Sequence, residues 1–293
     1  AQLQKDVRAH EPGVLVSYAE LRRGYPRDKQ AQSVKLLYRN PHAPFRVNIR
    51  ENYDSTFRTQ VDTSSRFKIF SHRLRKDFDK LTLTFGGSPS PEIYAAALDC
   101  DRGVAVDNIP FRGSSGIDFT RMNPDVLGEQ IRTLNVRLIV LQFGVNVVPY
   151  VQNDYNWYEQ SLYAQLRLLQ KLAPDASFLV IGVSDMSRRE GGGHVSYPNI
   201  ERIRDAQRKA AFRAGAAFWD TYVAMGGKNS MPSWVKARPA LAKEDYIHFT
   251  PKGAIIISEM LYKALINEYE KYRAKPRPQP LSQGEGSKIQ RTF

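Results

Sequence analysis

The sequence predicts an α/β fold with a parallel sheet, joined to an antiparallel β module that precedes it in the chain. In the second half, apolar runs of the buried-strand kind at residues 137–144 and 177–183 are each followed by an amphipathic helical segment, at residues 155–172 and 199–214. Strands and helices that alternate in this way form a parallel sheet with helices on both faces. In the first half, short alternating strands such as residues 80–85 follow one another without helices, which indicates the antiparallel module.

The predicted elements divide the chain into four parts. Residues 1–30 are charged and weakly patterned, with one short strand expected at residues 13–17. Residues 31–105 are rich in β-forming residues and turns, and we expect them to form the β module beside the α/β domain of residues 106–272. Residues 273–293 scatter prolines and glycines among basic and polar residues, which predicts a flexible tail. The strands expected in the module are residues 34–38, 45–49, 66–71, 80–85, 93–97 and 104–106. The remaining elements expected in the α/β domain are a helix at residues 124–134, a strand at residues 216–220 and a closing helix at residues 255–272.

Composition limits the classes of partner. The 293 residues are 42% hydrophobic and 11% aromatic, which is enough to bury a full core. No apolar run approaches the roughly 20 residues of a membrane span, so no transmembrane segment is expected. The formal charge of +13 and the pI near 9.7 indicate an anionic partner, such as nucleic acid, an anionic glycan or an anionic membrane surface. The basic residues are scattered and form no nucleic-acid-binding module, so nucleic acid is not expected, and a solvated basic surface is the alternative to any anionic partner.

The cysteine and histidine content gives little information about the redox compartment or about bound metals. Cys100 is the single cysteine, so an intramolecular disulfide is excluded and the redox compartment stays open. The five histidines lack metal-ligand spacing, and the glycine runs form neither a P-loop nor a dinucleotide fingerprint. We therefore expect no metal and no cofactor. The first residue, Ala1, fits either a mature terminus left by signal-peptide removal or a trimmed start.

The strongest chemical signal is an acid and an imidazole three residues apart, Asp245 and His248. Thr250 is a good N-cap and Pro251 a good first helical residue, so a helix is expected to begin just after the pair. A tight turn before that helix would bring the Asp245 carboxylate to one ring nitrogen of His248 and leave the other nitrogen free to act as a general base. The alternative is that Asp245 forms a turn and His248 is an ordinary surface histidine.

Two weaker signals lie earlier in the chain. Asn146 directly follows the first buried strand, and ligands bind beyond the carboxyl ends of such strands. Its amide can donate to a substrate oxygen, or it can simply cap a turn. Residues 112–116 form a glycine-containing loop in which a backbone N–H can approach an oxyanion, with a plain turn as the alternative.

In this order, the three stretches resemble the SGNH, or GDSL-type, hydrolase family. That family has a Gly block, a G-x-N block and a C-terminal D-x-x-H block, which match residues 112–116, 144–146 and 245–248. The resemblance covers about residues 103–272 and implies the flavodoxin-like SGNH hydrolase fold. Relatives similar to peptidoglycan O-acetylesterases carry an inserted β-rich, carbohydrate-binding-like module, which residues 31–105 resemble.

The resemblance also implies roles for individual residues. Asp245 and His248 match the acid and the base of a Ser-His-Asp triad. Asn146 matches the oxyanion asparagine, and Gly113 matches the oxyanion glycine, with Gly116 as the other register. The implied chemistry is acyl transfer through an acyl-enzyme.

A further resemblance implies the substrate class. Residues 218–227 and Trp234 resemble the subgroup that acts on cell-wall or extracellular polysaccharides. This implies a serine esterase that removes O-acetyl groups from an acetylated anionic polysaccharide or peptidoglycan, in the periplasm or outside the cell. The alternatives are a polysaccharide O-acetyltransferase, or a non-catalytic glycan-binding or scaffold protein that has lost its nucleophile.

The chain departs from the family at its first block, because it contains no Gly-Asp-Ser. We weigh Ser17, Ser88, Ser114 and Ser115 as nucleophiles, and none has the expected surroundings. The nucleophile is therefore expected on a segment outside this sequence or on a second chain, or it has been lost.

Two residues are candidates for contacting substrate. Trp234 lies in a Pro-Ser-Trp stretch expected to be a loop, where its ring could stack on a sugar, and core packing is the alternative. His194 follows three glycines in an expected mobile loop near the site, and a solvated histidine is the alternative.

Overall fold

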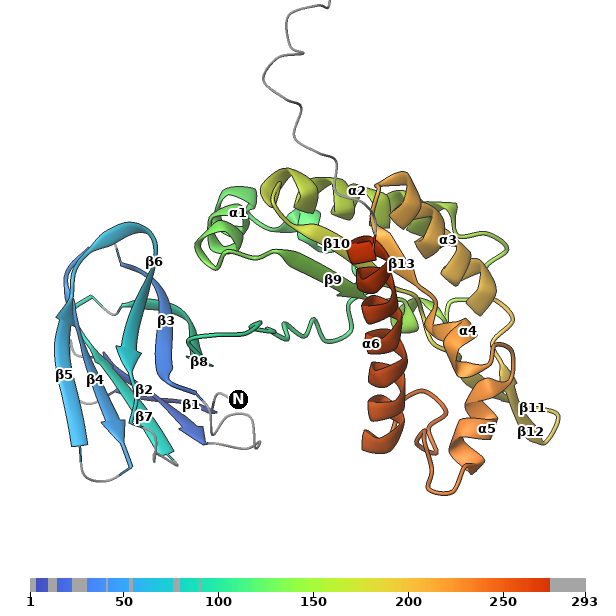
Figure 1. The fold of residues 1–293 in the computed structure, drawn as a ribbon, viewed down its shortest axis with the longest axis horizontal. Helices are drawn as coiled ribbons and strands as arrows, with labels where there is room; N and C mark the ends of the chain where they lie inside the picture. Colours follow the sequence, from blue (N-terminus) through green and yellow to red (C-terminus); the bar gives the residue numbers. More distant parts are fainter. Residues whose placement is uncertain are drawn as a thin grey trace, which may run out of the picture. The chain divides into compact units, whose positions relative to one another are not determined.

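A computed structural model describes residues 4–9, 15–22, 31–40, 42–52, 55–75, 80–89 and 91–274 (Figure 1). The chain forms two compact units. Of the described residues, those up to residue 112 together with 118–139 and 167–177 belong to one unit, and residues 113–117, 140–166 and 178–274 belong to the other. The predicted tail at residues 273–293 lies, from residue 275 onward, outside the described residues.

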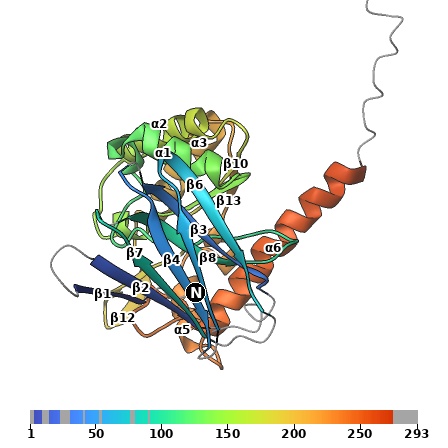
Figure 2. The ribbon, with the colours of Figure 1, turned by 90° about the vertical axis from the view of Figure 1, so that its left-hand side faces the viewer.

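The first unit is built on a β sandwich (Figures 1 and 2). A five-stranded antiparallel sheet has the order β1-β2-β7-β4-β5, and a three-stranded antiparallel sheet has the order β6-β3-β8. The strands are β1 (Gln4–Ala9), β2 (Leu15–Arg22), β3 (Ser33–Asn40), β4 (Phe45–Glu51), β5 (Ser55–Val61), β6 (Ser64–Arg73), β7 (Lys80–Gly86) and β8 (Glu92–Asp99).

Both sheets of the sandwich contribute to one core. Residues alternate along β4, with Phe45, Val47 and Ile49 buried and Arg46 and Arg50 exposed, as the period of two in a strand requires. The core also takes its side chains from β3, β5, β7 and the residue after β6, namely Val34, Leu36, Tyr38, Val61, Leu74, Leu81, Leu83 and Phe85.

The structure differs from the expected strands of this unit in three places. The antiparallel pairing starts before residue 31, because β2 pairs with β7 and β1 pairs with β2. Strand β5 was not predicted from the sequence. The strand expected at residues 104–106 is absent, because these residues lie in an extended connection with exposed side chains and have no partner strand.

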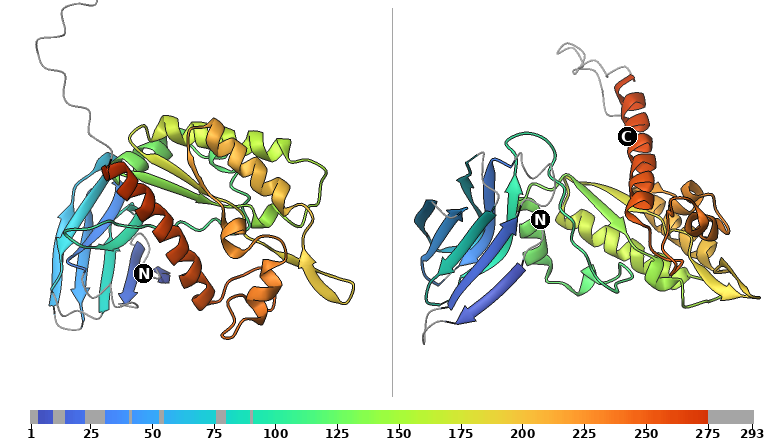
Figure 3. Two further views of the ribbon diagram at one scale, coloured as in Figure 1. Left: turned by 45° about the vertical axis from the view of Figure 1, so that its right-hand side comes forward. Right: turned by 90° about the horizontal axis from the view of Figure 1, so that it is seen from below.

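The second half of the chain has the predicted α/β architecture. Its central sheet has the order β13-β10-β9, with β10 and β13 parallel. Helix α6 crosses the sheet on the face opposite to α2 and α3 (Figures 1 and 3). The elements are α1 (Pro124–Thr133), β9 (Leu138–Gln142), α2 (Asn156–Leu172), β10 (Ser177–Ile181), β11 (Ser187–Glu190), β12 (Gly193–Ser196), α3 (Ile200–Arg213), β13 (Ala217–Trp219), α4 (Thr221–Met225), α5 (Ser230–Lys236) and α6 (Pro251–Ala274).

The hairpin of β11 and β12 replaces the mobile loop expected around residues 191–193. In the described part of the chain, no helix is both long and apolar enough to cross a membrane.

Candidate active site

The turn that precedes α6 holds an acid and an imidazole together. Oδ2 of Asp245 lies 2.8 Å from Nδ1 of His248, which is the predicted contact. Oδ1 of Asp245 accepts hydrogen bonds from the backbone N–H groups of Ile247, at 2.9 Å, and His248, at 3.0 Å. Tyr246, at the centre of this turn, has a φ of 57°, which few non-glycine residues adopt. The acid is therefore fixed to the imidazole by its side chain and by its own turn.

The electrostatics of the pair favour an ionised acid beside the ring. Partial burial raises the pKa of the Asp245 carboxyl, but the hydrogen bonds from the backbone N–H and ring of His248 and from the N–H of Ile247 outweigh this and hold the pKa below its ordinary value. The side chain of His248 is 66% exposed, so its far nitrogen can reach a substrate-bound group. Such an arrangement can orient a general base.

The start of α6 fixes this turn from the other side. Oγ1 of Thr250 accepts from the N–H of Gly253 at 3.2 Å, so Thr250 is the predicted N-cap, and it donates to the carbonyl of Ala240 at 2.7 Å. Gly253 allows a close approach of two backbones, because a Cβ at this position would lie 1.8 Å from the carbonyl oxygen of Leu241. The loop before the pair and the helix after it are therefore in direct contact.

The loop at residues 112–116 and Asn146 are also joined. Nδ2 of Asn146 donates to the carbonyl of Ser114 at 2.9 Å. The N–H of Gly116 donates to Oγ of Ser114 at 2.9 Å and is thus engaged within the loop, whereas Gly113 lies at an exposed turn with a φ of 79°. Buried Tyr158 donates its hydroxyl proton to the carbonyl of Ser115 at 3.0 Å. Of the two glycines that the sequence offers for the oxyanion, Gly113 is therefore exposed, and Gly116 is buried and bonded within the loop.

One apolar cluster brings the three stretches together. Its buried members come from the segment after β9, from α2, from the segment after β10, from α3 and from α4: Val147, Val148, Tyr155, Tyr158, Val183, Met186, Ile200, Ile203, Ala206 and Tyr222. Ile117, Val145 and Ile247 pack against it. These three residues neighbour the glycine loop, Asn146 and His248 respectively, so all three candidate stretches are anchored on the same core.

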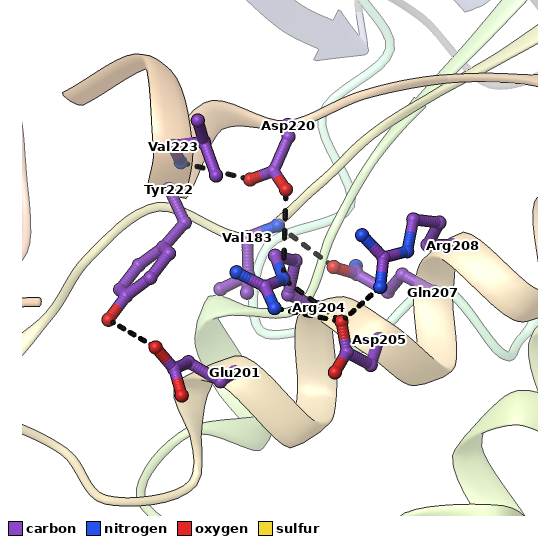
Figure 4. A network of polar contacts seen from close by, with 9 residues as sticks. All are labelled: Val183, Glu201, Arg204, Asp205, Gln207, Arg208, Asp220, Tyr222 and Val223. Atoms are coloured by element: carbon purple, nitrogen blue, oxygen red, sulfur yellow. Dashed lines mark hydrogen bonds and ion pairs between the residues drawn. The ribbon is translucent and has the colours of Figure 1, made fainter. Parts of the chain in front are cut away.

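Gln207 of α3 joins the ends of two central strands. Its side-chain carbonyl accepts from the N–H of Val183 at 2.8 Å, and its amide donates to the carbonyl of Phe143 at 2.9 Å. Figure 4 shows the first of these bonds beside an ion-pair network in which Arg204 lies 3.6 Å from Asp220. Because Gln207 is buried and bonds to both strand ends, it holds the segment that carries Asn146 in place.

Comparison with known proteins identifies the family. A family model described as the GDSL-like Lipase/Acylhydrolase family matches residues 78–255. The chain belongs to this family. The predicted resemblance to SGNH hydrolases and the predicted α/β fold with an added β module are both confirmed, and the protein is an SGNH-type acylhydrolase or esterase by family.

Solved structures that match this SGNH hydrolase include the following two. The chain is similar to a structure titled "Peptidoglycan O-acetylesterase in action, 5 min", with 19% identity, a TM-score of 0.66, and coverage of 92% of this chain and 77% of that one. It also matches a family two carbohydrate esterase from Clostridium thermocellum in complex with cellohexaose, with 8% identity, a TM-score of 0.34, and coverage of 92% and 99%. At these identities the first likeness concerns the fold, and the second TM-score is too low to support an argument. A search of curated proteins finds no significant match.

The two candidate substrate contacts lie in regular elements, whereas the sequence indicated loops. Trp234 belongs to α5 and is 8% exposed, with its indole N–H donating to the carbonyl of Met225 at 3.0 Å. A buried ring cannot stack on a sugar, so this position corrects the expected loop. His194 lies in β12 and stacks face to face on Tyr246, with ring centroids 3.6 Å apart and an interplanar angle of 10°.

Two positioning residues, Gln207 and Asp185, were not found from the sequence. Asp185 has no exposed surface, and its carboxylate accepts from Oγ of Ser196 at 2.6 Å and from the N–H of Met231 at 2.8 Å. Burial raises the pKa of the Asp185 carboxyl in spite of these bonds. Asp185 follows the apolar run at residues 177–183, just as Asn146 follows the run at residues 137–144, so its position after such a run is the sequence signal that indicates Asp185.

Proposed function

We propose that this SGNH hydrolase is a serine esterase that removes O-acetyl groups from a cell-wall or extracellular polysaccharide. The observation that carries the proposal is the 2.8 Å contact between Asp245 and the exposed ring of His248. A structural turn would need no imidazole at this position, whereas acyl transfer needs a base whose orientation and tautomer are set by an acid.

The proposed chemistry assigns each group one step. Nε2 of His248 takes the proton of a serine hydroxyl as its oxygen attacks the acetyl carbonyl, while Asp245 holds Nδ1–H and stabilises the imidazolium. The N–H of Gly113 and the amide of Asn146 donate to the oxyanion. His248 then gives its proton to the departing sugar oxygen, which leaves an acetyl-serine. In the second half of the reaction His248 takes a proton from a water molecule as its oxygen attacks the acetyl carbonyl, and it returns that proton to the serine oxygen as acetate leaves.

We further propose that the nucleophilic serine lies on a segment outside these 293 residues, which adds a strand beside β9. Among the described strands β9 is at the edge of its sheet, with Leu138 and Val140 exposed to 49% and 45%. Strands of a parallel sheet are normally paired and covered, and an apolar edge strand favours pairing. A parallel strand added there would end beside Asn146, where the oxyanion would form.

Three of the four serines weighed as nucleophiles, Ser17, Ser88 and Ser114, have other surroundings. Ser17 lies within β2 of the sandwich, where it pairs with Phe85, and Ser88 follows β7 of the same sheet. Oγ of Ser114 accepts a hydrogen bond from within its own loop. None of these serines stands directly after a strand of the parallel sheet, which supports an external nucleophile.

The proposed substrate is an acetylated anionic glycan such as peptidoglycan, met in the periplasm or outside the cell. The net charge of +13 supports an anionic polymer, and a fold shared with a peptidoglycan O-acetylesterase supports a glycan ester. The β sandwich is proposed to contribute glycan affinity. An O-acetyltransferase, or a non-catalytic glycan-binding scaffold, would use the same groups if water were excluded or the serine lost.

The experiment compares acetate release from O-acetylated peptidoglycan and from an acetylated neutral glycan, using the longest natural product of the gene. The proposal expects release that depends on His248 and falls steeply with added salt for the anionic substrate alone. Equal rates on both glycans at every salt concentration would contradict the substrate class. Absence of release together with glycan binding would favour the scaffold.

A further inference from the structure

We propose that His194 is a positioning residue that holds the Asp245–His248 pair in its productive geometry by stacking on Tyr246. The inference rests on the proposed function, in which this pair supplies the acid and the base. It assigns a role to the β11–β12 hairpin, which lies far from the pair in sequence.

Tyr246 is the residue on which the turn depends. Its φ of 57° lies in the left-handed region, which side chains other than glycine rarely adopt unless their surroundings impose it. This conformation directs the following N–H groups, of Ile247 and His248, toward Oδ1 of Asp245. A return of Tyr246 to a negative φ would rotate the next peptide unit and break this arrangement.

The hairpin holds Tyr246 at two points. The N–H of Ser187, at the start of β11, donates to the carbonyl of Tyr246 at 3.1 Å. The imidazole of His194, on β12, covers the face of the Tyr246 ring at a centroid distance of 3.6 Å and an angle of 10°. One contact fixes the backbone and the other fixes the side chain, so the residue cannot rotate without losing both.

The hairpin is itself anchored to the core. Ser196, two residues after His194, donates its hydroxyl proton to Oδ1 of buried Asp185 at 2.6 Å and its N–H to Oδ1 of Asn229 at 2.9 Å. Asn229 in turn donates its N–H to Oγ of Ser196 at 2.7 Å. His194 therefore projects from a fixed strand, and its stack can restrain Tyr246.

The test is an NMR titration of the Asp245 carboxyl carbon in the 293-residue chain, which needs no catalytic activity. Asp245 has a pKa held below its ordinary value by the bonds that the turn supplies. We expect His194→Ala to move this pKa upward toward the ordinary value. His194→Phe keeps a flat ring and should leave the Asp245 pKa in place. A role of His194 in hydrogen bonding to substrate would instead be lost in both variants, with a loss of activity in each.

Two controls test whether the shift in the Asp245 pKa arises from the stack of His194 on Tyr246. His72→Ala removes another histidine stacked on an aromatic ring, that of Phe57, with centroids 4.2 Å apart, and should leave the Asp245 pKa unchanged. In a Tyr246→Gly background the stack is absent and glycine adopts a positive φ freely, so His194→Ala should cause no further shift. If His194→Ala reduces the folded fraction, His194→Leu is used in place of His194→Ala, because the leucine side chain is apolar but not planar and cannot stack on Tyr246.

An unchanged Asp245 pKa in folded His194→Ala, or an equal shift in the Tyr246→Gly background, would overturn the inference. In the longer, serine-containing protein, His194→Ala should lower kcat with little change in KM, and His194→Phe should retain kcat. A shifted pKa without any esterase activity in that protein would uphold the positioning role and reject the proposed function instead.

Discussion

The Asp245 carboxylate contacts His248 in two ways, through the ring nitrogen at 2.8 Å and through the backbone N–H at 3.0 Å. The two bonds use different oxygens of one carboxylate, so the acid cannot turn away from the ring without also opening the turn. An acid three residues before its histidine therefore makes both bonds within one turn, while Tyr246, with its positive φ, is held from outside the turn by the β11–β12 hairpin.

The first prediction concerns stability and pH. Because the folded-state pKa of Asp245 is lowered, its contribution to stability is present above the unfolded pKa, near 3.9, and is lost as pH falls through the folded pKa. Asp245→Asn should therefore be less stable than wild type at pH 7, and the difference should shrink as the pH is lowered below 4. Urea unfolding of both proteins between pH 7 and pH values below 4 measures this difference in stability. Asp175→Asn, at an exposed site, is the control, and a difference that grows in acid would contradict the assignment.

The second prediction concerns the oxyanion. In the longer, serine-containing protein, Asn146→Ala should lower kcat on the order of 10²- to 10³-fold, because one preorganised donor is lost and the glycine loop loses its tie through Ser114. Steady-state kinetics with an aryl acetate measures the change. Asn153→Ala, in the loop before α2, should leave kcat within a factor of about two. A change in KM alone would show that Asn146 binds substrate without stabilising the transition state.

The third prediction concerns the buried acid. Asp185→Ala should reduce the free energy of unfolding by roughly 2–4 kcal/mol, because Ser196 and the N–H of Met231 lose a buried acceptor. Chemical denaturation at pH 7 measures the loss. Asp175→Ala, at an exposed surface ion pair, should change it by less than about 0.5 kcal/mol. Equal stability of the two variants would remove Asp185 as the anchor of the hairpin.

The fourth prediction concerns the backbone contact that fixes the start of α6. Gly253→Ala places a methyl group against the carbonyl of Leu241 and should cost about 1–3 kcal/mol, despite the better helix propensity of alanine. In Gly193→Ala the nearest atom to the new methyl lies at 3.9 Å, so this variant is the matched control. Thermal unfolding compares the two, and a Gly253→Ala protein as stable as wild type would show that the loop can move away.

The features that could be predicted from the sequence depend on residues close to one another in the chain. Asp245, His248, Thr250 and Pro251 lie within a few residues of one another, and turn and capping chemistry is local. The strands β9 and β10 were also predicted, because both are apolar runs, but only β10 is buried as expected, since Leu138 and Val140 of β9 are exposed.

Features set by distant contacts were missed. Residues 191–193 are three glycines that predict a loop, yet the flanking residues form a hairpin that packs on Tyr246. Trp234 was expected on the surface, but its ring packs beside Phe249 from the next segment of chain. The strand expected at residues 104–106 has suitable side chains and no neighbour to pair with.

The most direct test of the account is the turnover of an aryl acetate by three proteins: the 293-residue chain, the longest natural product of its gene, and that product carrying His248→Ala. We predict that the 293-residue chain shows almost no turnover and that Ser17→Ala, Ser88→Ala, Ser114→Ala and Ser115→Ala change nothing in it. We predict that the longer protein is faster by orders of magnitude and that His248→Ala abolishes the gain. A fully active 293-residue chain that loses its activity with any one of those serines would contradict the account, because the nucleophile would then lie within these residues.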